Sequence, residues 1–416
     1  MTDSPTRRVV ITGMGIHCPI GSTLDDVWTS ITTGKTGTGP ITRFDATDLD
    51  SQVAGEVSDF DPRQYLPAKE ARRADRYVSL AVASSLEAIE HAGLTINEGN
   101  SERIGVLIGT AMGGMETIEK ELGVLAERGP GRVSPFFVPM YLADMASGYV
   151  SITIGARGPN LATLSACASA AHAIGESAEI IRRGDADVML AGGSEAAVTR
   201  GSVAGFAALQ ALSTRNDDGE TASRPFDSTR DGFVIAEGAA VLVLESLEHA
   251  TNRGAEILAE VTGYGLTADA SHIVQPASDG GGAARAMRHA IDRMGITPAE
   301  VDYINAHGTS TPMNDRLETL SVKTVFGEVT CPPISSTKAL TGHLLGAGGG
   351  IEAVFTVQAI QQKTVPPTWH FQHEDPDCDL DYVTDGPRQA SIDHALSNSL
   401  GFGGHNVTLG ISRFSD

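Results

Sequence analysis

The alternation of two kinds of segment is the feature that most constrains how this chain can fold. Short apolar runs typical of strands alternate with longer alanine-rich stretches typical of helices. This alternation predicts an α/β fold with substantial parallel pairing, and runs that are apolar throughout indicate strands covered on both faces. The expected strands are Arg8–Gly13, Arg103–Ile108, Val188–Gly192, Ala239–Glu245, Val301–Ala306 and Val407–Ser412, and the expected helices include Arg72–Ala92, Met115–Ala126, Ala168–Arg183, Ala283–Met294 and Ile351–Gln361.

A coarse duplication is visible in the chain, although no short repeat is. In each half a strand runs into a glycine-rich loop, at Ile108-Gly109-Thr110 and again at Ala306-His307-Gly308-Thr309. The turn Asn252-Arg253-Gly254 is the best boundary, and no flexible linker separates the halves. We therefore predict an N-terminal half over residues 1–254 and a C-terminal half over residues 255–416.

The charge and polarity of the chain argue against two classes of partner. A formal net charge of −22 is poorly suited to nucleic-acid binding, in which lysine and arginine neutralise phosphates. No apolar run reaches the roughly 18–20 residues that a membrane span needs, and the polar segment Met1–Arg8 has no signal-peptide core. We expect a cytoplasmic protein that binds neither nucleic acid nor membrane.

The cysteines favour a nucleophile over a metal site or a disulfide framework. The four of them are far apart, without a CxxC pair or a histidine at metal-ligand spacing. Cys167 follows small residues and precedes a long alanine-rich stretch. The first N–H groups of a helix there would lower the pKa of its thiol below the usual value of about 8.5 and could donate to an oxyanion. A small cysteine packed at a strand–helix junction fits this segment equally well.

Two histidines lie in segments that suit a ligand site. His307 ends an expected strand within Asn305–Pro312 and is followed by a glycine and small hydroxyl residues. His343 lies in the glycine-rich segment Ser335–Gly350, shortly after Lys338. The lysine precedes the glycines, which is the wrong order for a phosphate-binding P-loop. Taken singly, these segments are also typical of a structural histidine and of a glycine-rich turn with a surface lysine.

Two further segments combine glycines with one larger side chain. Phe402 is bracketed by glycines within Ser397–Asn406, which suits a mobile loop with a bulky plug or a simple turn. Gly13-Met14-Gly15 follows a strand and half matches a dinucleotide-binding fingerprint. The third glycine and the acidic residue about twenty residues further on are missing. We interpret this segment as turn glycines.

Together, the segments around Cys167, His307, His343 and Phe402 resemble, in their order and their residues, the motifs of the elongating β-ketoacyl-acyl carrier protein synthases of the thiolase superfamily. The resemblance covers essentially the whole chain and includes the segments Leu212–Asp217 and Arg224–Phe233. It implies an α/β, thiolase-like fold of two βαβαβαββ halves in a layered α-β-α-β-α arrangement. It also implies a mixed five-stranded sheet in each half and, usually, a homodimer.

The resemblance implies the chemistry of the site. Cys167 would attack a carrier-protein thioester and hold the acyl chain. His307 and His343 would bind the malonyl thioester, promote its decarboxylation and stabilise the enolate oxygen. Lys338 would tune the electrostatics of the site, together with Glu352. No metal or cofactor is implied, because the phosphopantetheine arm arrives on the carrier protein.

The resemblance also implies which residues hold the substrates. Thr309 and Thr311 match phosphopantetheine-binding threonines, and Met112 and Phe206 fall where the acyl pocket is lined. Phe402 matches a gating phenylalanine, whose N–H would complete the oxyanion hole together with that of the nucleophile. Three positions depart from the family pattern: Gln210 replaces an arginine, Leu400 a phenylalanine and His405 a threonine.

A local basic patch is needed for docking, because carrier proteins are acidic and so is this chain. Lys69, Arg72 and Arg73 lie at the start of an expected helix and match docking positions of the family. Such contacts can overcome the net repulsion, since salt screens charges beyond about 8–10 Å. A solvated helix start is the alternative interpretation.

Three functions compete. The histidine pair distinguishes the chain from thiolases, with Cys-His-Cys, and from initiating synthases, with Cys-His-Asn. We expect a decarboxylating condensation that elongates a fatty acyl chain by two carbons. The alternative is the active ketosynthase subunit of a type II polyketide or polyene system, working with a chain-length factor. A silent partner subunit is the third hypothesis, and the presence of Cys167 argues against it.

Overall fold

The computed structural model describes residues 7–327 and 331–415, which form an α/β protein around one ten-stranded mixed sheet. The strands of this sheet are β1 (Val9–His17), β4 (Ile104–Gly109), β5 (Asn160–Leu161), β6 (Val188–Glu195), β8 (Gly238–Ser246), β9 (Ala259–Ala268), β10 (Tyr303–Asn305), β11 (Ile334–Ser335), β14 (His394–Gly401) and β15 (His405–Ser412). Their order across the sheet is β11-β10-β14-β15-β9-β1-β8-β6-β4-β5.

The two halves of the chain repeat one βαβαβαββ pattern. The helices within this pattern are α3 (Arg76–Ala92), α6 (Met145–Ile154) and α7 (Ser169–Arg183) in the first half, and α10 (Gly281–Met294), α11 (Pro312–Phe326) and α13 (Gly348–Gln362) in the second. From the middle outward, each half pairs its strands antiparallel, antiparallel, parallel and parallel. The expected duplication and five-stranded half-sheets are therefore confirmed, while the division at residue 254 stays a prediction.

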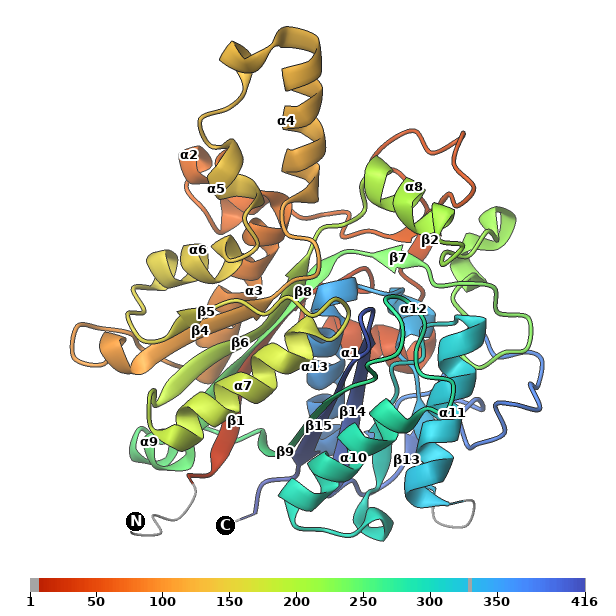
Figure 1. The fold of residues 1–416 in the computed structure, drawn as a ribbon. Coiled ribbons are helices and arrows are strands. Elements are labelled where there is room, and N and C mark those ends of the chain that lie inside the picture. The colour runs from red at the N-terminus through yellow and green to blue at the C-terminus, as the bar shows by residue number, and fades with distance from the viewer. Residues whose placement is uncertain (1–6, 328–330, 416) are drawn as a thin grey trace.

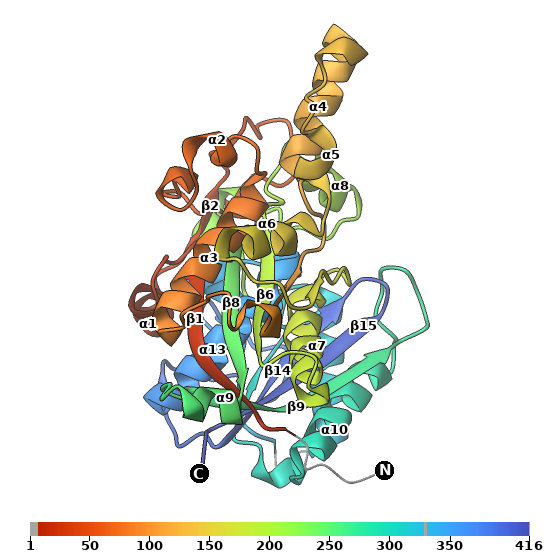
Figure 2. The ribbon, with the colours of Figure 1, turned by 90° about the vertical axis from the view of Figure 1, so that its left-hand side faces the viewer.

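The two half-sheets meet where β1 pairs with β9, at Val10↔Glu260 and Ile11↔Ala259. Helices α3 and α6 cover the outer face of the first half-sheet, and α10 covers that of the second, with α11 beside it. Helices α7 and α13 lie between the half-sheets, because each contacts strands of both. The result is the layered α-β-α-β-α arrangement (Figures 1 and 2).

The remaining elements are insertions around this frame. One pair, α4 (Met115–Arg128) and α5 (Phe137–Tyr141), forms an arm in which α4 projects far from the sheet (Figures 1 and 2). The others are α1 (Leu24–Thr33), α2 (Ala68–Ala71), α8 (Arg200–Ala208), α9 (Leu247–Asn252), α12 (Lys338–Thr341), β2 (Thr38–Pro40), β3 (Val53–Gly55), β7 (Ile235–Ala236), β12 (Thr364–Val365) and β13 (Arg388–Gln389). Among the described residues, no helix is both long enough and apolar enough to cross a bilayer.

Two local predictions are wrong. The helix expected from Arg72 begins only at Arg76, because the Asp75 side chain accepts the N–H of Tyr77 and caps it. Gly13 and Gly15 lie inside β1 rather than in a turn. A Cβ at Gly15 would lie 2.1 Å from the Ser84 carbonyl oxygen, so these glycines let α3 pack directly on the strand.

Candidate active site

The residues predicted to carry out the reaction meet at the carboxyl ends of parallel strands. Cys167 lies between β5 and α7, and His307 follows β10. Lys338 and His343 lie between β11 and α13, and Phe402 follows β14. In open α/β sheets this edge is where ligands bind, because loops and helix N-termini converge there.

Cys167 occupies a tight turn before α7. Ala166 has a φ of +50°, which turns the chain sharply, and the Ser169 hydroxyl accepts the N–H of Ser165 at 2.9 Å. Gly401 packs against this turn so closely that a Cβ there would lie 2.6 Å from the Ser165 carbonyl oxygen. The nucleophile turn and the Phe402 segment are thus held in contact.

The thiol of Cys167 does not have the lowered pKa that the helix position suggests. Burial raises its pKa to about 12, which outweighs the opposing effects of the Lys338 charge and of the N–H groups of Phe402 and Cys167 itself. The thiol is therefore protonated at neutral pH. Its Sγ lies 3.0 Å from Nε2 of His343, which is in position to take the proton.

The two imidazoles are neutral and lie edge to face, with ring centroids 5.3 Å apart. Burial lowers the pKa of both well below the usual value, and the Lys338 charge lowers both further. Glu318 holds the backbone at His307, since its carboxylate accepts the backbone N–H groups of His307 and Gly308 at 2.8 Å each. The backbone at His343 is held by its N–H group, which donates to the Val234 carbonyl at 2.7 Å.

Lys338 is a buried cation beside His307. Its ammonium donates to the carbonyl oxygen of His307 at 2.6 Å and lies 3.4 Å from the Nδ1 atom of that ring. It also forms an ion pair with Glu352. Burial raises the pKa of Glu352 to about 7, although the lysine acts in the opposite direction. Lys338 is thus paired with Glu352, the residue expected to act with it on the electrostatics of the site.

Thr309 and Thr311 lie together in the turn that follows His307. Their hydroxyl oxygens are 3.0 Å apart, and Thr311 caps α11 by accepting the N–H of Asn314. Between them Ser310 has a φ of +69°, a conformation that its surroundings must hold in place.

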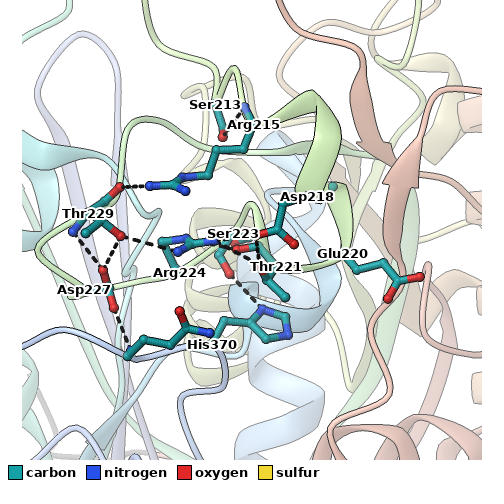
Figure 3. Close-up of polar contacts among 12 residues, drawn as sticks. Ser213, Arg215, Asp218, Glu220, Thr221, Ser223, Arg224, Asp227, Thr229 and His370 are labelled. Atoms are coloured by element: carbon teal, nitrogen blue, oxygen red, sulfur yellow. Dashed lines mark hydrogen bonds and ion pairs between the residues drawn. The ribbon is translucent and has the colours of Figure 1, made fainter.

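Residues of the segment 213–229 form a polar network with one another (Figure 3), and Arg224 of this network also contacts the strained turn. The Arg224 guanidinium lies 3.1 Å from the Asp218 carboxylate and 3.3 Å from the Thr229 hydroxyl. The Arg215 guanidinium donates to the Thr229 carbonyl at 2.6 Å. The backbone N–H of Arg224 in turn donates to the Ser310 hydroxyl at 3.0 Å. The motif segments 212–217 and 224–233 therefore hold the threonine turn in shape.

An apolar wall runs from the nucleophile to the predicted gate. Phe206 contacts Phe402 with ring centroids 6.4 Å apart and Phe233 at 5.4 Å, and Phe233 meets the His343 ring at 5.2 Å. Met112 packs in the same cluster as Cys167. The structure thus brings together the residues that the sequence assigns to an acyl pocket.

Comparisons with known proteins agree with this geometry. Residues 6–250 match the model of the β-ketoacyl synthase N-terminal domain, and residues 258–372 match that of the C-terminal domain. The chain belongs to the β-ketoacyl synthase family. It is 52% identical over 415 residues to the 3-oxoacyl-[acyl-carrier-protein] synthase 2 of Synechocystis sp., with 100% of each chain covered.

Two solved structures show the same fold of the β-ketoacyl synthases. One is the ishigamide ketosynthase/chain length factor, with a TM-score of 0.91 and 34% identity, and the match covers 99% of this chain and 100% of that chain. The other is AntDE:AntF, a type II PKS acyl-carrier protein in complex with its ketosynthase bound to the hexaketide. It has a TM-score of 0.91 and 34% identity, and the match covers 98% of this chain and 100% of that chain. The thiolase-like fold expected from the sequence is confirmed.

The positions that depart from the family pattern lie at two places. Leu400 and His405 lie on β14 and β15 at the base of the Phe402 loop. Gln210, with a φ of +56°, lines a surface cavity of about 430 Å³ together with Leu212 and Thr214. Gln210 therefore belongs to the surface of this β-ketoacyl synthase. His405 also faces inward, because its ring meets the ring of His172 on α7 at a centroid distance of 6.3 Å, and His172 lies 2.6 Å from the Ser165 hydroxyl of the nucleophile turn.

The predicted docking residues lie on the surface around α2, before α3. Lys69 and Arg72 are exposed. The Arg73 guanidinium stacks 4.2 Å from the centroid of the Phe136 ring, next to α5. Their expected place at the start of a long helix is corrected to a short helix and the turn after it.

Three acidic residues of the site escaped the sequence analysis. Glu318 holds the His307 turn, and Glu195 accepts the N–H groups of Ala111 at 2.7 Å and Gly346 at 3.0 Å, which joins the two loops. Asp269 accepts the amide of Asn406 at 2.8 Å, and its own N–H donates to the Gly404 carbonyl at 2.9 Å. Each acts on residues distant in sequence, so no local motif marks it.

Proposed function

We propose that this β-ketoacyl synthase joins an acyl chain held on Cys167 to a malonyl unit held on an acyl carrier protein, with loss of carbon dioxide. The observation that carries the proposal is the buried set of Cys167, His307 and His343, with Lys338 beside it. The product is a β-ketoacyl chain two carbons longer. The phosphopantetheine arm comes with the carrier and passes Thr309 and Thr311, so the enzyme needs no cofactor of its own.

Acyl transfer begins with the proton on sulfur. As Sγ attacks the thioester carbonyl, its proton moves to Nε2 of His343, 3.0 Å away. The N–H groups of Cys167 and Phe402, which point at the sulfur, donate to the carbonyl oxygen as it becomes negative. The bond from carbon to the pantetheine sulfur then breaks, and that sulfur takes the proton from His343.

Condensation uses His307 in a fixed tautomer. The Lys338 ammonium has only donors, so Nδ1 of His307 must be its acceptor and Nε2 carries the hydrogen. That N–H donates to the enolate oxygen that forms as carbon dioxide leaves. Nδ1 of His343 has no hydrogen-bond partner in the described part of the chain, so this ring can change tautomer and donate as well. The enolate carbon attacks the acyl carbonyl and the bond to Cys167 breaks. The departing thiolate then takes a proton from Nε2 of His343, 3.0 Å away, and solvent replaces that proton.

Elongation of fatty acyl chains is the proposed pathway, because the relative that is 52% identical over the full chain is a 3-oxoacyl-[acyl-carrier-protein] synthase 2. The second candidate is a polyketide ketosynthase that works with a chain-length factor. It is favoured by the 34% identity to ketosynthases of that kind and by the departures at Gln210, Leu400 and His405.

The decisive experiment is to supply the purified protein alone with an acyl primer and malonyl-carrier protein. We expect mass spectrometry of the carrier to show chains extended by two carbons. Activity that appears only after a chain-length factor is added would favour the polyketide candidate. Acylated Cys167 with no extension under either condition would contradict both.

A homodimer is the proposed assembly, and its interface is the face that carries β5 and the α4–α5 arm. Strand β5 ends the sheet and leaves one edge without a neighbour among the described strands. Large apolar side chains are exposed on the arm, on α6, on β5 and just after it: Leu122, Leu125, Val138, Leu142, Ile152, Leu161 and Leu164. Such a face is typical of an interface between subunits. Light scattering should give twice the mass of the chain, and Leu161→Asp should lower it.

We assign docking of the carrier protein to Lys69, Arg72 and Arg73, which lie next to the arm. If these residues dock an acidic carrier, their replacement by alanine should raise KM for the carrier protein and leave kcat nearly unchanged. A cytoplasmic location beside the carrier stays a prediction.

A further inference from the structure

The three groups of the proposed chemistry also form a set of ligands for a borderline or soft divalent metal. One ligand atom each from Cys167, His307 and His343 lies within 4.8 Å of the other two. Thiolate and imidazole are ligands that zinc prefers, and three protein ligands with an open fourth position are typical of catalytic zinc sites. All three residues are buried, with Cys167 the most exposed at 8%.

The ligand atoms already face one another. Nε2 of His343 lies 3.0 Å from Sγ, and Lys338 faces Nδ1 of His307, which leaves Nε2 of that ring for the cluster. Zn–S bonds of about 2.3 Å and Zn–N bonds of about 2.0–2.1 Å place tetrahedral ligand atoms about 3.3–3.6 Å apart. Small side-chain rotations would therefore bring the three atoms from their present separations to those of a zinc site.

The buried charges around the cluster act on a bound cation in opposite directions. The Lys338 charge, which lowers the pKa of both imidazoles, opposes a cation, but this lysine is paired with Glu352. Glu318 beneath His307 and Glu195 beside the cysteine accept only N–H and O–H donors, and neither forms a salt bridge within the described residues. A dication at the cluster would be balanced in part by these carboxylates and by the thiolate itself.

We propose that Cys167, His307 and His343 bind Zn²⁺ reversibly and that the ion inhibits the enzyme by occupying the nucleophile. The sulfur–zinc bond forms as the thiol proton passes to the buffer, and water fills the fourth position. Binding rests on the geometry of the three side chains alone, whereas the inhibition rests on the proposed function. A covalently held acyl chain would compete with the metal for the same sulfur.

Titration with Co²⁺ tests the binding without reference to activity. A thiolate bound to Co²⁺ gives an intense near-ultraviolet band, and tetrahedral coordination gives visible bands. We expect one equivalent of Co²⁺ to produce both in the wild-type protein and in Cys331→Ser, whose cysteine is half-buried outside the site. Cys167→Ala should lose the sulfur band, His343→Ala should change the visible bands, and Zn²⁺ should displace Co²⁺. Mg²⁺, which prefers oxygen ligands, should not.

The same ion should block the enzyme. One equivalent of Zn²⁺ should abolish acyl transfer, a chelator should restore it, and Zn²⁺ should slow alkylation of Cys167 in the wild-type chain. Equal Co²⁺ spectra for the wild type and Cys167→Ala would overturn the proposal, as would alkylation at an unchanged rate. If no metal binds while Cys167 still accepts an acyl chain, the metal site is wrong and the proposed function stands. If Zn²⁺ binds but Cys167 never accepts an acyl chain, the proposed function fails instead.

Discussion

At the residue scale, Cys167 is distinguished from the other cysteines by its partners and not by burial. Burial raises the thiol pKa of all four, to about 12 for Cys18 and Cys167 and about 11 for Cys331 and Cys378. Among the four cysteines, all within the described residues, only Cys167 has a ring nitrogen at 3.0 Å and a buried lysine that acts on its thiolate. Reactivity at this position therefore depends on transfer of the proton during attack.

We expect Cys167→Ala to abolish acyl transfer and to leave some malonyl decarboxylation, because both histidines remain. Iodoacetamide at low stoichiometry should label Cys167 before Cys331, although Cys331 is the more exposed. Peptide mass spectrometry would read out the labelled residue, with Cys331→Ser as the matched control. Labelling of Cys331 first, with activity retained, would contradict the nucleophile assignment.

The two histidines should differ when each is replaced by alanine. His343 takes the thiol proton, so His343→Ala should slow both formation of the acyl-enzyme and condensation. Loss of one donor to an oxyanion typically costs about 10²–10³ in rate, and His307→Ala should lower condensation by that amount while acylation proceeds. Mass spectrometry of the acyl-enzyme and of the carrier product separates the two steps. Equal loss of acylation in both variants would contradict the division of roles.

At the element scale, the loop between β14 and β15 joins the nucleophile to the rest of the site. Gly403 and Gly404 have φ of +86° and +77°, and the N–H of Gly403 donates to the Ile273 carbonyl at 2.9 Å. Phe402 is half-buried against Phe206 and can swing on these glycines. We predict that its ring blocks the approach to Cys167 until an acyl chain fills the pocket.

Phe402→Ala should then raise malonyl decarboxylation in the absence of primer. Leu400→Phe, two residues away at the base of the same loop, is the control, and its primer dependence should remain. Release of carbon dioxide with and without primer measures the effect. A ring found in one position with and without an acyl chain on Cys167, together with unchanged primer dependence in the alanine variant, would rule out the gate.

Most elements could be predicted because their signals are local. Every expected strand and helix is present, with ends displaced by a few residues. The start of α3 could also have been found, since Asp75 is a typical cap. The raised pKa of Cys167 could not be predicted. The helix N-terminus, which lowers the pKa, is visible in the sequence, but the burial that outweighs it depends on the packing of both halves. Glu318 is hidden for the same reason, since its partners lie on another element.

At the scale of the whole molecule, the duplication leaves a short signal in the sequence of the two central strands. Thr12-Gly13-Met14-Gly15 in β1 matches Thr262-Gly263-Tyr264-Gly265 in β9. In both strands the glycines let a helix pack on the backbone, since a Cβ at Gly265 would lie 1.9 Å from the Ala286 carbonyl of α10. Two short matches that far apart become informative only once the two strands are known to be equivalent.

The segment that joins the two halves, between β8 and β9, is held by hydrogen bonds to one buried carboxylate. Glu245, at 0% exposure near the end of β8, accepts hydrogen bonds from His249, Thr12 and Arg253, the last at 2.9 Å. Arg253 belongs to the turn before β9 and also donates to the Ala92 carbonyl of α3 at 2.8 Å. Burial alone would raise the pKa of Glu245, but these donors outweigh it and lower the pKa from 4.5 to about 2.

The lowered pKa makes the contribution of Glu245 to stability depend on pH in a definite direction. The unfolded chain binds its proton more readily, so the stabilisation is complete above pH 4.5 and is lost as the pH falls through about 2. We expect Glu245→Gln to lower the free energy of unfolding by about 2–3 kcal/mol near neutral pH, and by roughly half of that or less at about pH 3. Urea unfolding at both pH values measures the difference. The exposed neighbour Glu248→Gln should change neither value. A deficit for Glu245→Gln that does not shrink in acid would show that the loss comes from packing and not from the charge of this carboxylate.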